Sequence, residues 1–408
     1  MRLNPFRAIH AAPARVAAIA SPPYDVVSRA EAAALARDRP LSFLRVCRAE
    51  IDLPDTVDAY DPRVYARARE NLGALLAGGA LVRDERPALF VYRQVMEGRA
   101  QTGVVGCVHV DDYEAHVIRK HENTRPDKED DRTRHVLALN AQAEPVLLMY
   151  RDRPEIGRLV TAATTAPPLF DFATPDDVAH TVWRVDDPAP YLVGFAGVPA
   201  AYIADGHHRS ASAWRAARQR RAGNPRHDGS EEYNWILAAL FPAAELRILA
   251  YNRVITDLAG RAPDEILREL AKLGRLSSTD DPVPPRPGVF CFYLASAWRR
   301  LELPEDSIDR SDPVRALDVS LLQDRVLGPL LGITDQRTDQ RIDFVGGIRG
   351  VRALQARVDS GAAALAISFH PTTVEQLMSV ADRGDIMPPK STWFEPKLLS
   401  GLFVHPLD

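Results

Sequence analysis

The stretch A-A-Y-I-A-D-G-H-H-R-S-A-S-A-W (200–214) constrains the fold more than any other part of the sequence. An apolar strand ends at Ala204, a carboxylate and a glycine follow, and a helix begins at about His208. A buried strand that turns so quickly into a helix is typical of α/β proteins. Gly206 lets the backbone approach a ligand closely, because glycine has no side chain. The sequence therefore predicts an α/β fold with a ligand site at this junction.

The same junction carries groups suited to an anion such as phosphate. The N–H groups of a first helical turn and the helix dipole both favour negative charge. His207 and His208 lie in this turn, Arg209 adds a fork that fits phosphate, and Asp205 is a candidate magnesium ligand or base. The alternative is that Asp205 only caps the helix and the next three residues are a polar first turn. Three basic residues there are unfavourable unless an anion is bound, which favours the ligand site.

A second stretch, R-K-H-E-N-T-R-P-D-K-E-D-D-R-T-R-H (119–135), is dense in charge and follows a predicted strand. Loops in that position commonly carry the functional groups of α/β proteins. His121 and Glu122 set a titratable base beside a carboxylate, which can orient a hydroxyl or hold a divalent ion. The alternative is a solvated charged loop that leads into a surface helix. We predict that this stretch and D-G-H-H-R line one pocket, with His121, Glu122 and Asp205 catalytic and with Glu122 and Asp205 as metal ligands.

Lysine is scarce in this chain, because only five of its 51 basic residues are lysine: Lys120, Lys128, Lys272, Lys390 and Lys397. A strong bias toward arginine should replace any lysine whose only role is positive charge. A compact ammonium at a tight site is not replaceable in this way. Chance is the alternative explanation for so small a set. We predict a ligand cradle of Gly206, His207, His208 and Arg209, joined by Lys120, Lys128, Arg132 and Lys390.

The 408 residues exceed one ordinary core, so two or three domains are expected. An acidic, proline-rich segment at 280–288 indicates a boundary. It separates a main α/β domain (1–280) from a C-terminal α/β portion (281–408) that packs on the site. Ser28 is expected to cap a helix with Glu31, and R-A-Q-T-G (99–103) resembles a hairpin turn. Periodicity predicts helices over 62–78, 319–332 and 373–384, and strands over 88–94, 103–110, 145–150, 180–185, 200–204, 234–241, 247–254, 288–294 and 364–369. The proline-rich segment 385–403 holds Lys390 and Lys397, and Glu395 is available to pair with either. The alternative is that this segment is only a packed strand pair with structural prolines.

Composition excludes several classes of protein. The net charge of −4 offers no bulk basic field for nucleic acid. Three dispersed cysteines argue against a disulfide framework and for a reducing compartment. They also fit no zinc spacing, and the adjacent His207 and His208 lack an HxxxH pattern, so zinc is disfavoured. No signal peptide or apolar run of about 18 residues is present, so we expect a cytoplasmic protein with no membrane contact. A homodimer is compatible with these features.

Several motifs in combination resemble the family called domain of unknown function 1015, over nearly the full length. They are P-F-R-A (5–8), P-P-Y-D-V-V (22–27), K-H-E-N-T with D-R (120–132), A-D-G-H-H-R (204–209) and P-P-K-S-T-W-F-E-P-K-L-L-S-G-L (388–402). The D-G-H-H-R-S-A-S-A run also resembles the phosphate box of the ParB/sulfiredoxin superfamily, and of its free serine kinases in particular. That likeness implies a ParB/sulfiredoxin-like nucleotide-binding core with an additional mixed α/β C-terminal portion. The two boxes are about eighty residues apart, more than a compact ParB core needs, and no helix-turn-helix is evident.

By that resemblance, Gly206 to Arg209 bind nucleotide phosphates, Asp205 assists the metal or the acceptor, and Glu122 is the base. The sequence thus favours a phosphotransferase that uses ATP or ADP with Mg2+ and acts on a small hydroxylated metabolite, of which free serine is one candidate. Phosphoryl transfer needs mainly positioning and positive charge, plus a base for the acceptor. Two alternatives use the same anion site: an isomerase or hydrolase of a phosphorylated small molecule, and a ParB-like nucleotide switch.

Overall fold

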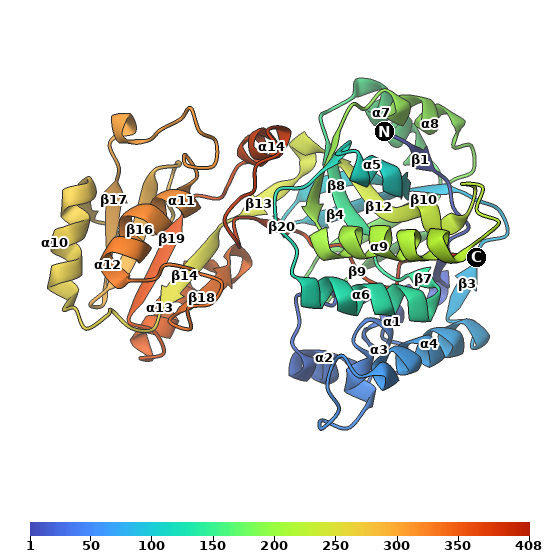
Figure 1. Ribbon diagram of the computed structural model, residues 1–408, viewed down its shortest axis with the longest axis horizontal. Coiled ribbons are helices and arrows are strands. Elements are labelled where there is room, and N and C mark those ends of the chain that lie inside the picture. The colour runs from blue at the N-terminus through green and yellow to red at the C-terminus, as the bar shows by residue number, and fades with distance from the viewer. The chain divides into compact units, whose positions relative to one another are not determined.

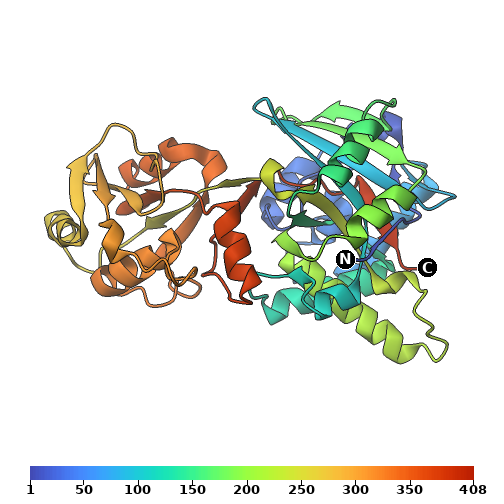
Figure 2. The same ribbon diagram turned by 90° about the horizontal axis from the view of Figure 1, so that it is seen from above.

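The computed structural model describes residues 1–408, which divide into two compact units. Unit 1 comprises Met1–Leu246 and Pro396–Asp408, and unit 2 comprises Arg247–Glu395. Both chain ends belong to unit 1 (Figures 1 and 2). The fold is mixed α/β, as the sequence predicts. None of the helices combines the length and the apolar character that a membrane span requires.

The division differs from the expected boundary at 280 in position and in continuity. Unit 1 ends at Leu246 because the next two strands, β13 (Arg247–Leu249) and β14 (Tyr251–Ile255), pair only with strands of unit 2. Residues 396–408 return to unit 1, because β21 (Phe403–Pro406) pairs with β2 (Ile9–Ala11) and β7 (Ala141–Gln142). Such a return is a long-range pairing that local periodicity does not report.

Unit 1 is built on a nine-stranded sheet with the order β6-β11-β8-β12-β5-β4-β10-β9, to which β1 adds beside β5. Most neighbours are antiparallel, but β6 with β11 and β8 with β12 are parallel. The strands are β1 (Leu3–Asn4), β4 (Leu89–Met96), β5 (Arg99–His109), β6 (Ile118–Arg119), β8 (Val146–Tyr150), β9 (Phe170–Ala173), β10 (Ala179–Val185), β11 (Ala201–Asp205) and β12 (Trp235–Pro242).

Side chains of β4 show how both faces of this sheet are buried. Leu89 and Val91 join the main core with residues of α7 (Pro154–Ala163), α8 (Ala189–Ala196) and α9 (His207–Gly223). Phe90 and Tyr92 lie on the other face, where their ring centres are 5.0 and 6.3 Å from that of Phe403. Successive side chains of a strand point to opposite faces, so a strand covered on both faces is apolar along its length.

The remaining elements of unit 1 are a second sheet and several helices. That sheet has the order β3-β2-β21-β7, with β3 at Leu81–Arg83. The helices are α1 (Val16–Ile19), α2 (Arg29–Ala36), α3 (Leu44–Cys47), α4 (Pro62–Ala77), α5 (Val110–Glu114) and α6 (Pro126–Leu139). Helices α6 and α9 run side by side (Figure 1), and Ser212 of α9 donates to the Glu129 carbonyl of α6 at 3.1 Å. This contact ties the two predicted site regions together.

Unit 2 has an antiparallel six-stranded sheet of order β15-β17-β16-β19-β14-β18, and a separate pair formed by β13 and β20. Its core includes Val254, Tyr293, Val345, Leu354 and Ala366. The further strands are β15 (Arg275–Ser278), β16 (Val289–Leu294), β17 (Ala297–Glu302), β18 (Ile342–Gly346), β19 (Leu365–Phe369) and β20 (Trp393–Glu395). The helices are α10 (Pro263–Leu273), α11 (Asp318–Leu322), α12 (Gly328–Leu331), α13 (Gly350–Asp359) and α14 (Val374–Asp382).

Local sequence signals located most elements to within a few residues. Ser28 and Glu31 form the expected capping box, and the helix stopped by Gly332 ends there in a left-handed turn. One expectation was wrong, and one alternative is not observed. The turn between β4 and β5 lies at Glu97 and Gly98, because residues 99–103 are already strand. The segment 385–403 does not form a strand pair, since β20 pairs with β13 and β21 pairs with β2 and β7.

Candidate functional site

The two sequence boxes leave the sheet at the same edge. Strands β6 and β11 are parallel neighbours, with Ile118 opposite Ala201 and Arg119 opposite Tyr202. Because parallel strands end on the same side of a sheet, the loop after Arg119 and the turn at Gly206 emerge next to each other. The ligand-type atoms of His121, Glu122 and His207 lie within 4.8 Å of one another. The structure thus brings both boxes together, as the sequence predicts.

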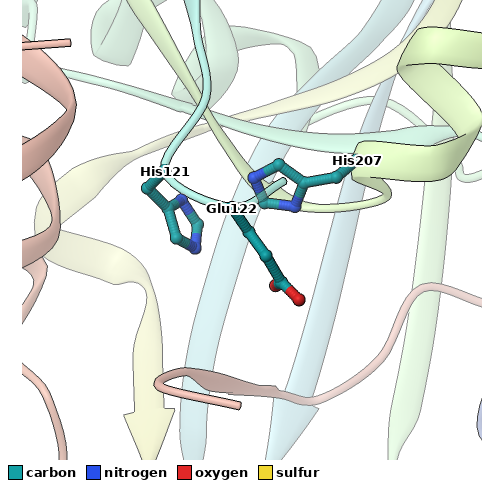
Figure 3. Close-up of side chains that lie close together, drawn as sticks. All are labelled: His121, Glu122 and His207. Atoms are coloured by element: carbon teal, nitrogen blue, oxygen red, sulfur yellow. The ribbon is translucent and has the colours of Figure 1, made fainter. Parts of the chain in front are cut away.

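Figure 3 shows how these three side chains are presented. His121 and Glu122 come from one loop, and His207 is the first residue of α9. The rings of His121 and His207 meet edge to face, with centres 4.5 Å apart and planes at 87°. Both histidines are buried, with 1% and 7% of their surface exposed, whereas Glu122 is half-buried. The cluster therefore has an enclosed imidazole side and a more open carboxylate side.

Burial sets the charge of the two histidines. It lowers the pKa of His121 to about 4, although a hydrogen bond to the Ile203 backbone and the nearby Asp205 carboxylate oppose this shift. It lowers the pKa of His207 well below its usual value, and the neighbouring His121 and His208 add to the effect. A charged imidazole is disfavoured in an apolar environment. Both rings are therefore neutral at pH 7, while Asp205 lies close enough to act on the cluster.

Gly206 gives α9 its entry. Its φ of +98° lies in the left-handed region, and a Cβ there would sit 3.1 Å from Nε of Arg209. Position 206 therefore requires glycine for conformation as well as for space. Helix α9 has no acidic residue in its first turn and no side-chain cap. The N–H groups of residues 207–209 lie in the first turn and therefore have no partner within the helix. No carboxylate of this turn offsets the positive N-terminal end of the helix dipole.

Arg209 is directed at protein groups. Its Nη2 donates to Oδ2 of Asp205 at 2.8 Å and lies 3.9 Å from Oδ2 of Asp25. Its Nη1 donates to the carbonyl of Pro145, and its Nε is buried without a partner. Burial alone would lower the pKa of Arg209, but the carboxylates of Asp25 and Asp205 raise it above its usual value. The fork expected to hold phosphate thus anchors Asp205 in this structure.

Asp205 is placed between two cations. Besides Arg209, the ammonium of Lys397 lies 3.8 Å from its Oδ1. Asp205 is not part of the His121–Glu122–His207 group, so the group that could hold a metal contains only one of the two carboxylates expected as ligands. The two oxygens of Asp205 face Arg209 and Lys397 instead.

The other predicted basic residues lie in varied places. Lys120 is exposed on the loop beside His121. Lys128 donates to the Tyr60 hydroxyl at 2.7 Å, and the buried Arg132 pairs with Asp131 at 2.8 Å over the Tyr24 ring. His208 accepts the Arg125 N–H at its Nε2, 3.0 Å away, so this nitrogen carries no proton. Lys390 belongs to unit 2, where its ammonium lies 5.4 Å from the centre of the Tyr251 ring.

A sequence profile decides the family. The profile of the DUF1015 proteins, described as proteins of unknown function, matches residues 3–320. The chain belongs to the DUF1015 family. Of the five motifs that suggested this, four lie wholly within unit 1 and the fifth (388–402) runs from unit 2 into unit 1.

Solved structures similar to this DUF1015 protein share little sequence with it. The chain is 11% identical to SbnI with C-terminal truncation from Staphylococcus aureus, covering 74% of this chain and 87% of that one, at a TM-score of 0.39. It is 12% identical to a conserved hypothetical protein from Pyrococcus furiosus, over 74% and 95%, at 0.35. It is 14% identical to a free serine kinase in complex with AMP, over 73% and 92%, at 0.35. No curated protein matches the chain.

Sequence reasoning missed two charged residues of this site. Lys397 was noted as one of the five lysines but was not placed beside Asp205. The return of residues 396–408 to unit 1 cannot be inferred from the local sequence. Asp25 sits in the P-P-Y-D-V-V motif, which was recognised as a family feature without a role. The signal for both was their membership in the family motifs. The assumption that the family motifs meet at one site would have pointed to both residues.

Proposed function

We propose that this DUF1015 protein is a nucleotide-dependent phosphotransferase that acts on the hydroxyl group of a small metabolite. One observation carries the proposal: the Glu122 carboxylate lies within 4.8 Å of a nitrogen of His207, the first residue of α9. A group able to take a proton and a helix start able to hold phosphate therefore share one site. Phosphoryl transfer needs these two functions side by side.

The start of α9 serves as the phosphate side of the site. Its first amides and its dipole favour an anion, and Gly206 allows close approach of the backbone. Lys397 and Lys120 add positive charge, the first half-buried beside Asp205 and the second exposed next to His121. In this proposal Arg209 acts indirectly, by holding Asp205 and the chain at Pro145 in place.

Glu122 is the base for the acceptor, and ATP or ADP is the phosphate donor. The D-G-H-H-R box (205–209) is similar to that of free serine kinases, which makes free serine the first acceptor to test. Magnesium would accompany the nucleotide phosphates, because Mg2+ is usually held by phosphates and only one or two carboxylates. Asp25, whose side chain is 36% exposed, is the site carboxylate best placed to join them.

A second function, hydrolysis of a phosphorylated small molecule, is favoured by one specific observation. Two histidines and one glutamate that converge are a ligand set used by enzymes that activate water on a metal. Such an enzyme would use the same phosphate cradle but would need no nucleotide.

The test is turnover of the full chain with ATP or ADP and Mg2+, with free serine and other small alcohols as acceptors. Products are followed by phosphorus NMR, and nucleotide affinity by calorimetry. Glu122→Gln should lower kcat by about 100-fold or more while nucleotide affinity changes little, because loss of a general base costs about 10²–10⁴-fold. Glu70→Gln on α4 is the matched control, since Glu70 is exposed and pairs only with Arg67. Absence of nucleotide binding, or phosphate release without nucleotide, would refute the kinase and favour the hydrolase.

A further inference from the structure

We infer that His121, Glu122 and His207 form a binding site for a divalent transition-metal ion of the Zn2+ class. The sequence alone disfavoured zinc, because His207 and His208 are adjacent and no HxxxH pattern is present. The structure supplies what the pattern lacked, since the second imidazole and the carboxylate come from the loop after β6. This inference goes beyond the proposed function and does not depend on phosphoryl transfer.

The geometry requires only a small contraction. Zinc holds nitrogen and carboxylate oxygen at about 2.0–2.2 Å, so tetrahedral ligands lie roughly 3.3–3.5 Å apart. The three ligand-type atoms here lie within 4.8 Å of one another. Glu122 is half-buried and is the most exposed of the three. Two of the three groups are already fixed, because the rings of His121 and His207 are buried and pack edge to face.

The surroundings of the two imidazoles support an ion independently of this spacing. His207 is only 7% exposed, and its buried Nε2 has no hydrogen-bond partner. Burying a polar atom without a partner is costly and uncommon in folded proteins. The ring of His121 is held by a hydrogen bond to the Ile203 backbone. Metal-bound histidines usually make such a bond with their second nitrogen, because it fixes the ring.

The donor set selects the class of ion. Magnesium and calcium prefer oxygen ligands, whereas imidazole suits zinc, iron, cobalt and related ions. Three protein ligands leave at least one coordination position open, which is the pattern of catalytic rather than structural sites. Asp205 does not compete for the ion, because Arg209 and Lys397 face its two oxygens. An ion held by these three side chains would take Glu122 as a ligand in place of its role as base, and would supply that function itself by lowering the pKa of a hydroxyl or water in the open position.

The test uses the untagged full chain, stripped with a chelator and titrated without nucleotide. Zn2+ is followed by calorimetry and by elemental analysis, and Co2+ by its visible absorption. We expect one ion per chain and a cobalt spectrum of four- or five-coordinate type. His121→Asn, His207→Asn and Glu122→Gln should each weaken Zn2+ binding by at least about tenfold, since even outer-shell changes cost 10–100-fold. His116→Asn is the control, because His116 is exposed and its left-handed backbone suits asparagine, and it should bind zinc as the wild type does.

Circular dichroism establishes that each variant is folded. If a variant of a buried histidine does not fold, zinc binding by Glu122→Gln tests the site, because Glu122 is only half-buried and its substitution should leave the fold intact. Binding of less than one ion per chain, or equal binding by wild type and Glu122→Gln, would overturn the metal site. Nucleotide affinity measured on the same chelated protein keeps the two proposals apart. Nucleotide binding without zinc binding ends only the metal inference, and zinc binding without nucleotide binding ends only the kinase.

Discussion

Two buried arginines, Arg209 in unit 1 and Arg253 in unit 2, have opposite surroundings. Arg209 donates to Asp205 and has Asp25 nearby, and these carboxylates raise its pKa. Arg253 is fully buried, and its guanidinium donates to Gln336 at 2.9 Å and to the carbonyls of Tyr251 and Lys390. Its flat face lies 4.5 Å from the centre of the Phe344 ring. No carboxylate pairs with Arg253, and burial lowers its pKa to about 9.

Acidic residues extend the comparison. In unit 1, the buried Asp131 pairs with Arg132 at 2.8 Å. In unit 2, the buried Asp318 accepts one N–H, from Gly288 at 2.8 Å, and its Oδ2 has no partner. Burial raises the pKa of Asp318 to about 7, against a small opposing effect of the Gly288 N–H. Ion pairs thus surround the candidate site of unit 1, whereas the buried charges of unit 2 hold backbone segments together.

Acidification should have the largest effect, and its sign should differ between the units. In unit 1, burial lowers the pKa of His121, His135 and His180 to about 4. Because these values lie below the unfolded value of about 6.5, the stability that they contribute is complete above pH 6.5 and is lost as the pH falls toward 4. Each group contributes roughly 3 kcal/mol, since one pKa unit corresponds to about 1.4 kcal/mol.

Asp318 acts in the opposite direction in unit 2. Its folded pKa is raised, so the stability that it contributes is complete below its unfolded pKa near 4 and is lost as the pH rises through about 7. Between pH 7 and pH 4.5, hydrogen exchange of the full chain should therefore accelerate in unit 1 and slow in unit 2, after correction for the intrinsic rate. Asp318→Asn should abolish only the response of unit 2. Parallel changes in both units would remove the distinction between them.

Replacing each arginine by methionine tests the comparison directly. Arg209→Met removes the nearer cation of Asp205, leaving it only Lys397, and removes the cation beside Asp25, and breaking a buried pair from one side costs about 3–5 kcal/mol. Because Asp205 is 29% exposed, we expect about 3 kcal/mol in urea denaturation. Arg253→Met leaves no charge behind and keeps an apolar chain against Phe344, but it loses the three hydrogen bonds to Gln336, Tyr251 and Lys390. At about 1 kcal/mol per lost bond, a similar loss of about 3 kcal/mol is expected. The two losses should differ in their pH dependence, because protons can neutralise the partly buried carboxylates left by Arg209→Met, whereas Arg253→Met leaves no carboxylate behind. If the loss for Arg209→Met, relative to the wild type, does not shrink as the pH falls, the carboxylates around Arg209 contribute nothing particular.

The large effect expected for Arg209→Met also shows what the sequence could not reveal. The D-G-H-H-R run identified a strand, a left-handed glycine and a helix start in the correct order, because these are local features. The stretch 119–135 was identified separately, from its charge and its position after a predicted strand, since such loops are common at sites. The D-G-H-H-R run could not show that Arg209 faces Pro145, because that contact depends on how β8 and β11 pack. The pair of Arg209 with Asp205 is local, since the two residues are four apart, but Arg209 was assigned to phosphate instead.

The boundary between the units was hidden for the same reason. Residues 247–255 are apolar and β-like, and periodicity cannot tell which sheet such a strand joins. Pairing of β14 with β18 and β19 assigns it to unit 2. The position of the scarce lysines depends on this assignment, because Lys390 and Lys397 lie on different sides of the second boundary, at Glu395.

Substitution of these lysines by arginine should have the smallest effects on nucleotide affinity and stability, but it distinguishes lysines of the site from lysines of the scaffold. Lys397 has 16% of its side chain exposed, lies 3.8 Å from Asp205, and its carbonyl accepts from Gln94 at 2.8 Å. A planar guanidinium cannot take the place of a compact ammonium there, so Lys397→Arg should weaken nucleotide binding by about tenfold. Lys272→Arg should be silent, because its 68% exposed side chain pairs only with Glu269 at the end of α10, and such surface changes usually stay within about 0.5 kcal/mol.

Lys390→Arg decides between two explanations of lysine scarcity. Lys390 has a positive φ of 59° and its ammonium lies against the Tyr251 ring within unit 2. If a role in the site preserved it, calorimetry should show weaker nucleotide binding, as for Lys397→Arg. If packing preserved it, nucleotide affinity should stay as in Lys272→Arg, while the stability of unit 2 should change by less than about 1 kcal/mol, because arginine also makes a cation–π contact but with a different shape. We expect the first result, because the motif at 388–402 contains both lysines. The second would confine the functional lysines to unit 1 and make the contrast between the units complete.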